Sequence, residues 1–212
     1  MAIVTGSAMG VFRGKIGNAV SYQLNGKNVV KSLPSKTAKN KRGTITQNLN
    51  RSKFTKMQHF LQPIIYFIRV GFNMEARSRQ MSAHNAAKSY NMLNAFSTEG
   101  EIDYNKVLVS FGNLAGAVNV TVVQDDAGLH FSWKNNSEPH LVRSDDQVML
   151  LAYSPHYNSA EFMLSGARRK AGHETLDMYG VEKGNEVHTW IAFISDDRQK
   201  ISMSTYVGKN IF

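Results

Sequence analysis

Seven histidines are the residues of this chain best suited to catalysis or metal binding. They are His59, His84, His130, His140, His156, His173 and His188. None belongs to an H-E-x-x-H pattern or another close ligand pair, and the chain has no cysteine to complete a zinc site or act as a thiol nucleophile. His173 and Glu174 could form a general base with its orienting carboxylate, but the sequence offers no third partner. The histidines therefore predict no catalytic site, no metal site and no cofactor.

Three pairs of adjacent aspartates could bind calcium or form a carboxylate dyad. They are Asp125-Asp126, Asp145-Asp146 and Asp196-Asp197. The D-x-D-x-D-G spacing of a calcium loop is missing, and each pair lies where a turn is expected, because Asp accepts hydrogen bonds from nearby backbone amides. We interpret the pairs as turn residues, and we expect His130 and His188, which alternate with apolar residues, to point outward from strands. With no nucleophile elbow or nucleotide-binding fingerprint either, the sequence favours a protein that is not an enzyme.

Basic residues are concentrated in the N-terminal third of the chain. Of the 25 Lys and Arg residues, twelve precede the first acidic residue, Glu75, whereas the rest of the chain has a net charge of −3 and the whole chain +9. This asymmetry predicts a basic arm with an anionic partner, either nucleic acid, a phosphate-rich surface or the acidic face of a neighbouring subunit. The alternative is a solvated face that keeps the protein soluble. The candidate partner-binding or anion-binding residues are Lys15, Lys27, Lys31, Lys39, Lys41, Arg42, Arg51 and Lys53.

A second basic cluster, Arg168-Arg169-Lys170, lies near the end of a strand-like run. It could add an anion-binding point to the surface. We favour a different interpretation, in which the three side chains form a charged edge that discourages strand-to-strand aggregation.

The basic arm is expected to contain a β-hairpin. Asn25-Gly26 separates two strand-like runs between Ala19 and Ser32, and this dipeptide is typical of a turn whose two central residues need positive φ. Tyr22, Val29 and Val30 are the candidate hairpin contact residues. Gly14-Lys15 is not a phosphate-binding loop, because Ile16 stands where Ser or Thr is required.

A polar, basic linker over residues 35–43 precedes a predicted helix. Thr44 and Gln47 match a capping box, and an apolar stripe follows at spacings of three and four residues. The stripe consists of Phe54, Met57, Leu61, Ile64 and Ile68. Pro63 should kink this helix, or break it so that a new helix starts there, because proline has no amide hydrogen to donate. A second helix is predicted over residues 81–96.

Eight strand-like runs separated by turn residues follow, over residues 106–111, 117–123, 129–133, 148–153, 161–165, 174–178, 187–194 and 201–207. Such spacing is typical of an antiparallel β-sandwich. Leu129, Phe131 and Trp133 alternate with polar residues, as expected of a half-buried strand. The predicted fold class is therefore α+β, organised as a basic glycine-spaced arm with a β-hairpin (1–43), a two-helix segment (44–103) and a β-sandwich domain (104–212).

The runs LHFSWKN, VMLLAY, ETLDMYGVEKGNEVHTWIAF and KISMSTYVG resemble the B, C, E–F and G strands of a fibronectin type III-like module. The resemblance covers about half of the chain. It places Trp133 at the core tryptophan position, Tyr153 at the aromatic position of the next strand and Gly184 in a turn. Val187 and His188 stand near the place of the corner tyrosine, which is missing. The resemblance implies an immunoglobulin-like sandwich.

Four further segments carry a resemblance over the whole chain: Gly14–Asn18, Gly26–Ser32, Thr46-Gln47 with Arg51–Phe54, and Ser204–Gly208. In these segments the chain resembles an uncharacterised Bacteroidota family of small basic proteins, a domain of unknown function. The likeness implies a shared layout and no particular activity. Some phage and bacterial assembly proteins have the same plan of basic arm, helical segment and sandwich, which is an analogy of fold.

The arrangement favours a structural or assembly protein. Because an isolated hairpin is only marginally stable in water, the arm should dock on its own domain or on another subunit, where strand addition would supply main-chain hydrogen bonds. The expected partners are further copies of the chain, in an oligomer or filament, or another protein. The alternative is sequence-independent nucleic-acid binding by the same arm. A carbohydrate-binding or hydrolytic sandwich ranks third, because Trp133 and Trp190 lie in strand patterns that predict burial.

Composition and hydropathy predict a soluble protein with one or two compact units. The chain has 212 residues, of which 42% are hydrophobic. Its most apolar segment, Phe60–Phe72, contains Pro63 and Arg69 and is shorter than the roughly 20 residues that a bilayer span needs. The N-terminal residues do not resemble a secretory signal. We therefore expect a protein that has no membrane span and is synthesised in the cytoplasm. Its final location stays open between the cytoplasm, a virion and an extracellular assembly.

Overall fold

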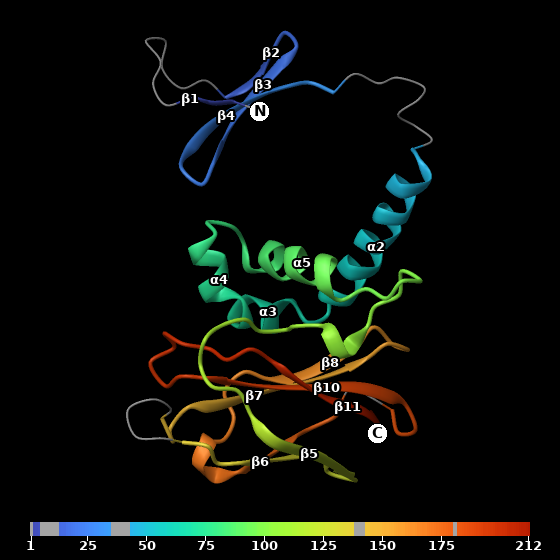
Figure 1. Ribbon diagram of the computed structural model, residues 1–212, viewed down its shortest axis with the longest axis vertical. Coiled ribbons are helices and arrows are strands. Elements are labelled where there is room, and N and C mark those ends of the chain that lie inside the picture. Colours follow the sequence, from blue (N-terminus) through green and yellow to red (C-terminus); the bar gives the residue numbers. More distant parts are fainter. Residues whose placement is uncertain (1, 5–12, 35–42, 138–142, 180–181) are drawn as a thin grey trace. The chain divides into compact units, whose positions relative to one another are not determined.

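The structure, a computed structural model, describes residues 2–4, 13–34, 43–137, 143–179 and 182–212 (Figure 1). The chain divides into two compact units: an N-terminal unit, Met1–Asn48, and a C-terminal unit, Leu49–Phe212. The division falls within helix α2 (Ile45–Leu61). The N-terminal unit contains one small sheet, whereas the C-terminal unit combines helices with two sheets.

The sheet of the N-terminal unit is antiparallel, with strand order β1-β4-β3-β2. Its strands are β1 (Ala2–Val4), β2 (Gly14–Ile16), β3 (Ala19–Leu24) and β4 (Lys27–Ser32). The predicted hairpin is confirmed, since β3 pairs with β4 and places Leu24 opposite Lys27. Asn25 and Gly26 form the turn with φ values of 49° and 75°, as a two-residue hairpin loop requires.

Four helices form the helical layer of the C-terminal unit. They are α2, α3 (Ile65–Gly71), α4 (Asn73–Ser78) and α5 (Ala83–Asn94). The capping box at the start of α2 is confirmed: the Gln47 amide donates to Thr44 Oγ1 at 3.2 Å, and the Thr44 amide donates to Gln47 Oε1 at 3.0 Å. The predicted break at Pro63 is also confirmed, because α2 ends at Leu61 and α3 begins at Ile65. The short helix α4 was not predicted.

The predicted α+β fold with an antiparallel β-sandwich is confirmed. A four-stranded sheet has the order β11-β10-β7-β8, and a three-stranded sheet has the order β5-β6-β9. Their strands are β5 (Val118–Asp125), β6 (Gly128–Lys134), β7 (Gln147–Ser154), β8 (Ser159–Met163), β9 (His173–Leu176), β10 (Glu186–Ile194) and β11 (Thr205–Ile211). Strands β6 and β9 share one sheet while β7, β10 and β11 share the other, as the B/E and C/F/G strands do in immunoglobulin-type sandwiches.

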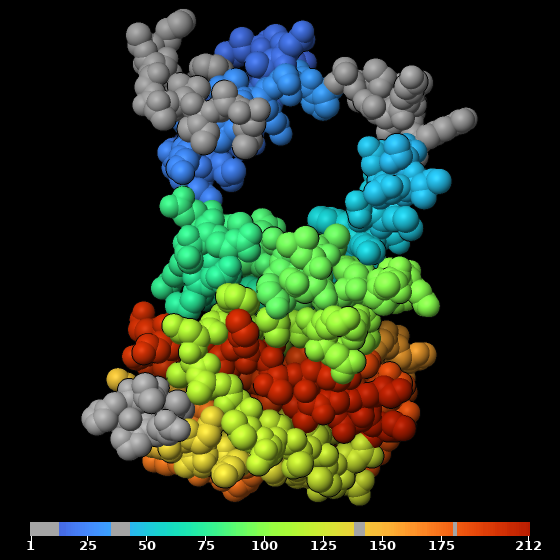
Figure 2. Space-filling view, viewed as in Figure 1, coloured from blue at the N-terminus to red at the C-terminus, as the bar shows by residue number. Residues whose placement is uncertain are grey.

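The four-stranded sheet is buried on both faces, so the C-terminal unit has three layers. In β7 and β10, Leu150, Phe193 and their alternate neighbours pack between the two sheets. Leu151, Trp190 and their alternate neighbours pack instead against the helices. In Figure 2 the red strands of the middle sheet lie between the green helical layer and the yellow-green outer sheet. Burial on both faces explains why the sequences of β7 and β10 are almost continuously apolar.

The prediction of a strand over residues 106–111 is wrong. This segment begins as a 3-10 turn, η1 (Tyr104–Lys106), and then runs without strand pairing. The Asn91 side chain accepts from the Leu108 amide at 2.9 Å and donates to its carbonyl at 2.8 Å, while Ser204 Oγ accepts from the Val109 amide at 2.9 Å. Side chains from distant elements thus satisfy backbone groups that a neighbouring strand would otherwise satisfy.

Candidate functional site

Cross-strand register brings three of the predicted basic residues to one face of the N-terminal sheet. Lys15 lies opposite Val20, which lies opposite Lys31, and Tyr22 lies opposite Val29. Opposed residues and alternate residues of a strand point to the same face of a sheet. This face, called the lysine face below, comprises Lys15, Val20, Tyr22, Leu24, Lys27, Val29 and Lys31. Lys31 Nζ lies 5.2 Å from the centroid of the Tyr22 ring, as this placement requires.

The lysine face has no acidic counterpart within its own unit. Residues 1–48 contain eight basic residues and no acidic residue, so the N-terminal unit has a net charge of +8. Lys15, Lys27 and Lys31 are exposed, and Tyr22 is half-buried beside them. Val29 is 3% exposed, whereas Leu24 beside the turn is 51% exposed, so the hydrophobic residues of this face are only partly covered. Val30, the remaining hairpin contact residue of the prediction, belongs to the opposite face.

The other predicted basic residues are distributed elsewhere. Lys39, Lys41 and Arg42 lie outside the described residues. Arg51 and Lys53 lie on helix α2 in the C-terminal unit. Lys53 Nζ is 5.3 Å from the centroid of the Phe96 ring, so this side chain makes a local contact instead of extending freely into solvent.

The Arg168-Arg169-Lys170 cluster is only partly the charged edge that was predicted. Arg168 and Lys170 are exposed, and each bonds Asp145 at 3.0 Å. The Arg169 side chain is completely buried, and its guanidinium pairs with buried Asp146 at 3.3 Å. For Arg169 the edge interpretation is therefore wrong, because the preceding turn directs this side chain into the protein instead of along the surface.

Arg169 is held by acceptors from three separate segments. Its guanidinium donates to the carbonyl oxygens of Ala115 at 2.8 Å and Gly116 at 3.3 Å, and to Asn136 Oδ1 at 2.7 Å. It also lies 3.8 Å from the centroid of the Phe193 ring. These contacts tie the loop before β5 and the end of β6 to the four-stranded sheet, so the role they indicate for Arg169 is structural.

The turn role predicted for the aspartate pairs is confirmed for Asp125 and Asp197, whereas Asp146 is instead buried beside Arg169. Asp125 Oδ1 accepts from the backbone amides of Ala127 at 2.8 Å and Gly128 at 3.2 Å, which confirms its turn role. Asp197 Oδ1 accepts from the Gln199 amide at 2.9 Å in the same way. Within the described ranges, no group of three His, Asp or Glu side chains is placed to hold a metal ion.

The prediction that His188 points outward is wrong. Its side chain lies on the helical side of β10, its Nδ1 is 2.8 Å from the Tyr206 hydroxyl, and its ring stacks on Tyr104 with centroids 3.8 Å apart. Burial lowers the pKa of His188, and the nearby Glu186 carboxylate partly opposes this shift. A polar residue was expected to face solvent here because the sequence does not show the helical layer that covers this face of the sheet.

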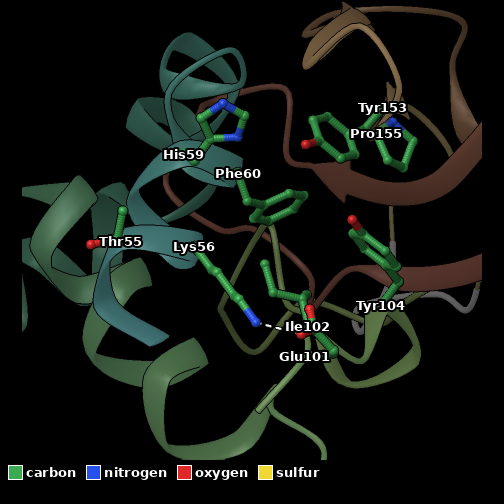
Figure 3. Close-up of a pocket in the computed structure, with 9 residues that line it drawn as sticks. All are labelled: Thr55, Lys56, His59, Phe60, Glu101, Ile102, Tyr104, Tyr153 and Pro155. Atoms are coloured by element: carbon green, nitrogen blue, oxygen red, sulfur yellow. Dashed lines mark hydrogen bonds and ion pairs between the residues drawn. The ribbon is translucent and has the colours of Figure 1, made fainter. Parts of the chain in front are cut away.

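A pocket in the C-terminal unit was not predicted from the sequence. Its volume is about 540 Å³. Helix α2, the loop before and into η1, and the end of β7 supply the residues that line it: Thr55, Lys56, His59, Phe60, Glu101, Ile102, Tyr104, Tyr153 and Pro155 (Figure 3). This site is called the tyrosine pocket below. No local motif marks it, because its three segments are far apart in the sequence.

The walls of the tyrosine pocket combine aromatic rings with an ion pair. The rings of Phe60 and Tyr153 lie 4.9 Å apart in an edge-to-face arrangement, and Tyr104 lies about 6 Å from both. Lys56 Nζ forms an ion pair with the Glu101 carboxylate and donates to the Gly100 carbonyl at 3.1 Å. Burial raises the pKa of Tyr153 to about 12 and raises that of Tyr104 further, so both hydroxyls remain protonated at neutral pH.

Comparison with known proteins identifies a family without an assigned activity. No curated protein matches the chain. No helix within the described ranges is long and apolar enough to cross a membrane. Residues 11–208 match the family described as "Family of unknown function (DUF6266)". Because the match includes strands of both units and the helices between them, the chain belongs to this family of unknown function over nearly its whole length.

Proposed function

We propose that this protein is a non-enzymatic structural or assembly protein that self-associates, or docks on a partner protein, through its basic N-terminal unit. The observation that carries the proposal is the lysine face, where three lysines surround Tyr22 and Val29 in a unit without acidic residues. A small sheet with uncompensated charge and an aromatic residue on the same face is suited to binding an acidic surface.

The edges of the N-terminal sheet offer a second kind of contact. Within the described residues, β1 pairs only with β4 and β2 pairs only with β3. An edge strand leaves backbone amides and carbonyls unpaired, and these can accept a strand from another chain. Ile16 on β2 is 59% exposed, which adds an apolar contact at this edge. Strand addition at β2 would therefore allow copies of the chain to join.

Charge pairing in the C-terminal unit helps to define the acidic partner. Within the described residues, eight of the 16 acidic residues of the chain form ion pairs with Lys or Arg side chains of the same unit. Asp145, for example, is bonded by both Arg168 and Lys170. We therefore infer that the lysine face binds an acidic partner protein, while contacts between copies use the sheet edges. The resemblance to the plan of some phage and bacterial assembly proteins supports this proposal as an analogy of fold.

The test compares two variants with the same net charge. The first replaces the three lysines of the lysine face by glutamine. The control removes three charges from exposed residues of the C-terminal unit, namely Arg77, Lys134 and Lys200. Capture of partners from a native extract and sedimentation velocity over a range of concentrations are measured for both. We expect partner capture to be lost in the lysine-face variant and kept in the control. A third protein, which lacks residues 1–43, should lose concentration-dependent association. Equal behaviour of the two variants would contradict a role for the lysine face.

Sequence-independent nucleic-acid binding is the second candidate, because a lysine face without acidic residues also suits a phosphate backbone. Tyr22 is the one aromatic side chain on this face for base stacking, which makes the candidate weaker. Binding of labelled random-sequence DNA at about 50 and 200 mM salt tests it. If the three lysines contact duplex phosphates, replacing them should reduce the log–log salt slope by about 2.7. Absence of binding at low salt would exclude this candidate.

A further inference from the structure

We propose that the tyrosine pocket binds a neutral saccharide ring. The pocket lies wholly within the C-terminal unit, so this inference does not depend on the function proposed for the lysine face. Its volume of about 540 Å³ falls within the range of roughly 300–1,000 Å³ that is typical of small-molecule sites. Such sites combine apolar walls with a few polar groups that orient the ligand, and both are found here.

The charges that line the pocket favour an uncharged ligand. Lys56 and Glu101 are its charged residues of opposite sign, and they pair with each other across the wall (Figure 3). A ligand with a net charge would attract one member of this pair and repel the other. A hydroxyl group can instead donate to the Glu101 carboxylate and accept from the Lys56 ammonium without disturbing the pair. Neutral ligands that carry several hydroxyl groups therefore match this wall best.

Two tyrosine hydroxyl groups of the protein face the interior of the pocket (Figure 3). The Tyr104 hydroxyl has no hydrogen-bond partner within the described part of the chain, and Figure 3 shows it directed toward Phe60 and Tyr153. The Tyr153 hydroxyl donates to Asn158 Oδ1 at 3.0 Å and keeps lone pairs that can accept a hydrogen bond. The Thr55 hydroxyl donates to the Arg51 carbonyl at 3.0 Å and points away from Phe60 and Tyr153 in Figure 3. The pocket thus offers one unassigned donor and several acceptors to a ligand rich in hydroxyl groups.

The angles between the aromatic rings distinguish a saturated ring from a flat one. Phe60 and Tyr153 are inclined by 85°, Phe60 and Tyr104 by 63°, and Tyr104 and Tyr153 by 42°. No two of these three rings are parallel, so they do not form the slot that would hold a nucleobase between two faces. His188 stacks on Tyr104 with ring centroids 3.8 Å apart. Phe60 and Tyr153 are only 1% and 3% exposed, so the half-buried Tyr104 offers the main aromatic surface to a ligand. An aromatic face carries partial negative charge and can contact the C–H groups of a saturated ring.

The experiment titrates the full-length protein with neutral saccharides and follows tryptophan fluorescence. The ring centroid of Trp190 lies 6.2 Å from those of Phe60 and Tyr104, so Trp190 should report occupancy of the pocket. Trp133 instead packs in the hydrophobic cluster between the two sheets. The probes are glucose, galactose, mannose, N-acetylglucosamine and their disaccharides, each checked by saturation-transfer NMR. Adenosine serves as a flat neutral comparator, and glucuronate as an anionic one. We expect saturable binding of at least one neutral saccharide and weaker binding of both comparators.

Three variants locate the binding. Tyr104→Phe removes only a hydroxyl and should weaken binding about two- to tenfold. Thr55→Phe fills the mouth of the pocket from an exposed position of α2 and should abolish binding. Ser52→Phe is the matched control, because it places the same side chain on an exposed position of the same helix outside the pocket lining. The proposal is overturned if no saccharide binds, if adenosine binds more tightly, or if the Thr55 and Ser52 variants behave alike.

Discussion

The buried Arg169–Asp146 pair yields a quantitative prediction for the stability of the C-terminal unit. Both side chains have no exposed surface, and three further oxygen acceptors surround the guanidinium. Arg169→Met keeps much of the side-chain volume but leaves the Asp146 carboxylate buried without its cation. Removing one partner of a buried pair typically costs about 3–5 kcal/mol, because the remaining charge loses its compensation. The backbone carbonyl of residue 169, which accepts from Trp133 Nε1 at 2.9 Å, is retained in the variant.

The expected change in melting temperature follows from this free energy. For a protein of about 150–250 residues, each kcal/mol lowers the melting temperature by about 2–4 °C, so Arg169→Met should lower it by roughly 6–20 °C. Calorimetry and urea unfolding of the full chain measure the effect. Arg168→Met is the matched control: it removes an adjacent, exposed arginine from Asp145 and should cost no more than about 1 kcal/mol.

The same variant should show a characteristic pH dependence. Burial raises the pKa of Asp146, and Arg169 opposes that rise. Without Arg169 the pKa of Asp146 should rise further. At pH values below this raised pKa the carboxyl group is protonated, so no unpaired charge is buried and the variant loses little unfolding free energy. Above the raised pKa the carboxylate is ionised and the full loss of unfolding free energy is expected. The difference in unfolding free energy between wild type and Arg169→Met should therefore be larger at pH 8 than at pH 4. A cost below about 1 kcal/mol at pH 8, or a cost that grows as pH falls, would refute this account.

Three other predictions concern single residues. His188, whose pKa is lowered by burial, should make stability fall as pH drops below about 6.5, because the unfolded chain binds the proton more readily; melting curves of wild type and His188→Gln between pH 5 and 8 check this. Asn91→Ala should cost about 2–3 kcal/mol in urea unfolding, since the partly buried backbone amide and carbonyl of Leu108 would both lose their side-chain partner. Gly26→Ala should destabilise the hairpin by roughly 1–2 kcal/mol, because a residue with a Cβ is strained at a φ of 75°. The added Cβ would not clash with any neighbouring atom, and amide exchange in β3 and β4 measures the effect.

Features that depend on residues close together in the sequence were predicted correctly. The Asn25-Gly26 turn, the capping box at Thr44 and the helix break at Pro63 all involve interactions within about four residues. The alternation in β6 likewise identified Leu129, Phe131 and Trp133 as core residues. These features are encoded by local backbone preferences and by the period of two of a strand.

The shared lysine face needed register as well as sequence. The sequence predicted the Asn25-Gly26 hairpin and named Tyr22 and Val29 as contact residues, but the pairing of these two residues and the position of Lys15 depended on strand register. A shift of one residue in that pairing would move Lys15 to the opposite face. The sequence therefore indicated a basic unit, while strand pairing decided which lysines act together.

The tyrosine pocket, the buried positions of Arg169 and His188 and the irregular path of residues 106–111 were decided by tertiary structure alone. Arg169 meets acceptors at Ala115 and Gly116, more than 50 residues away in the chain. Continuously apolar β7 and β10 were the available signal that both faces of their sheet are covered, but this pattern does not say which element covers them. By itself the sequence determined the local elements, the strand-rich fold class and the uneven charge. The surroundings of each buried polar side chain depend on contacts that exist only after distant segments pack together, and local propensities do not encode those contacts.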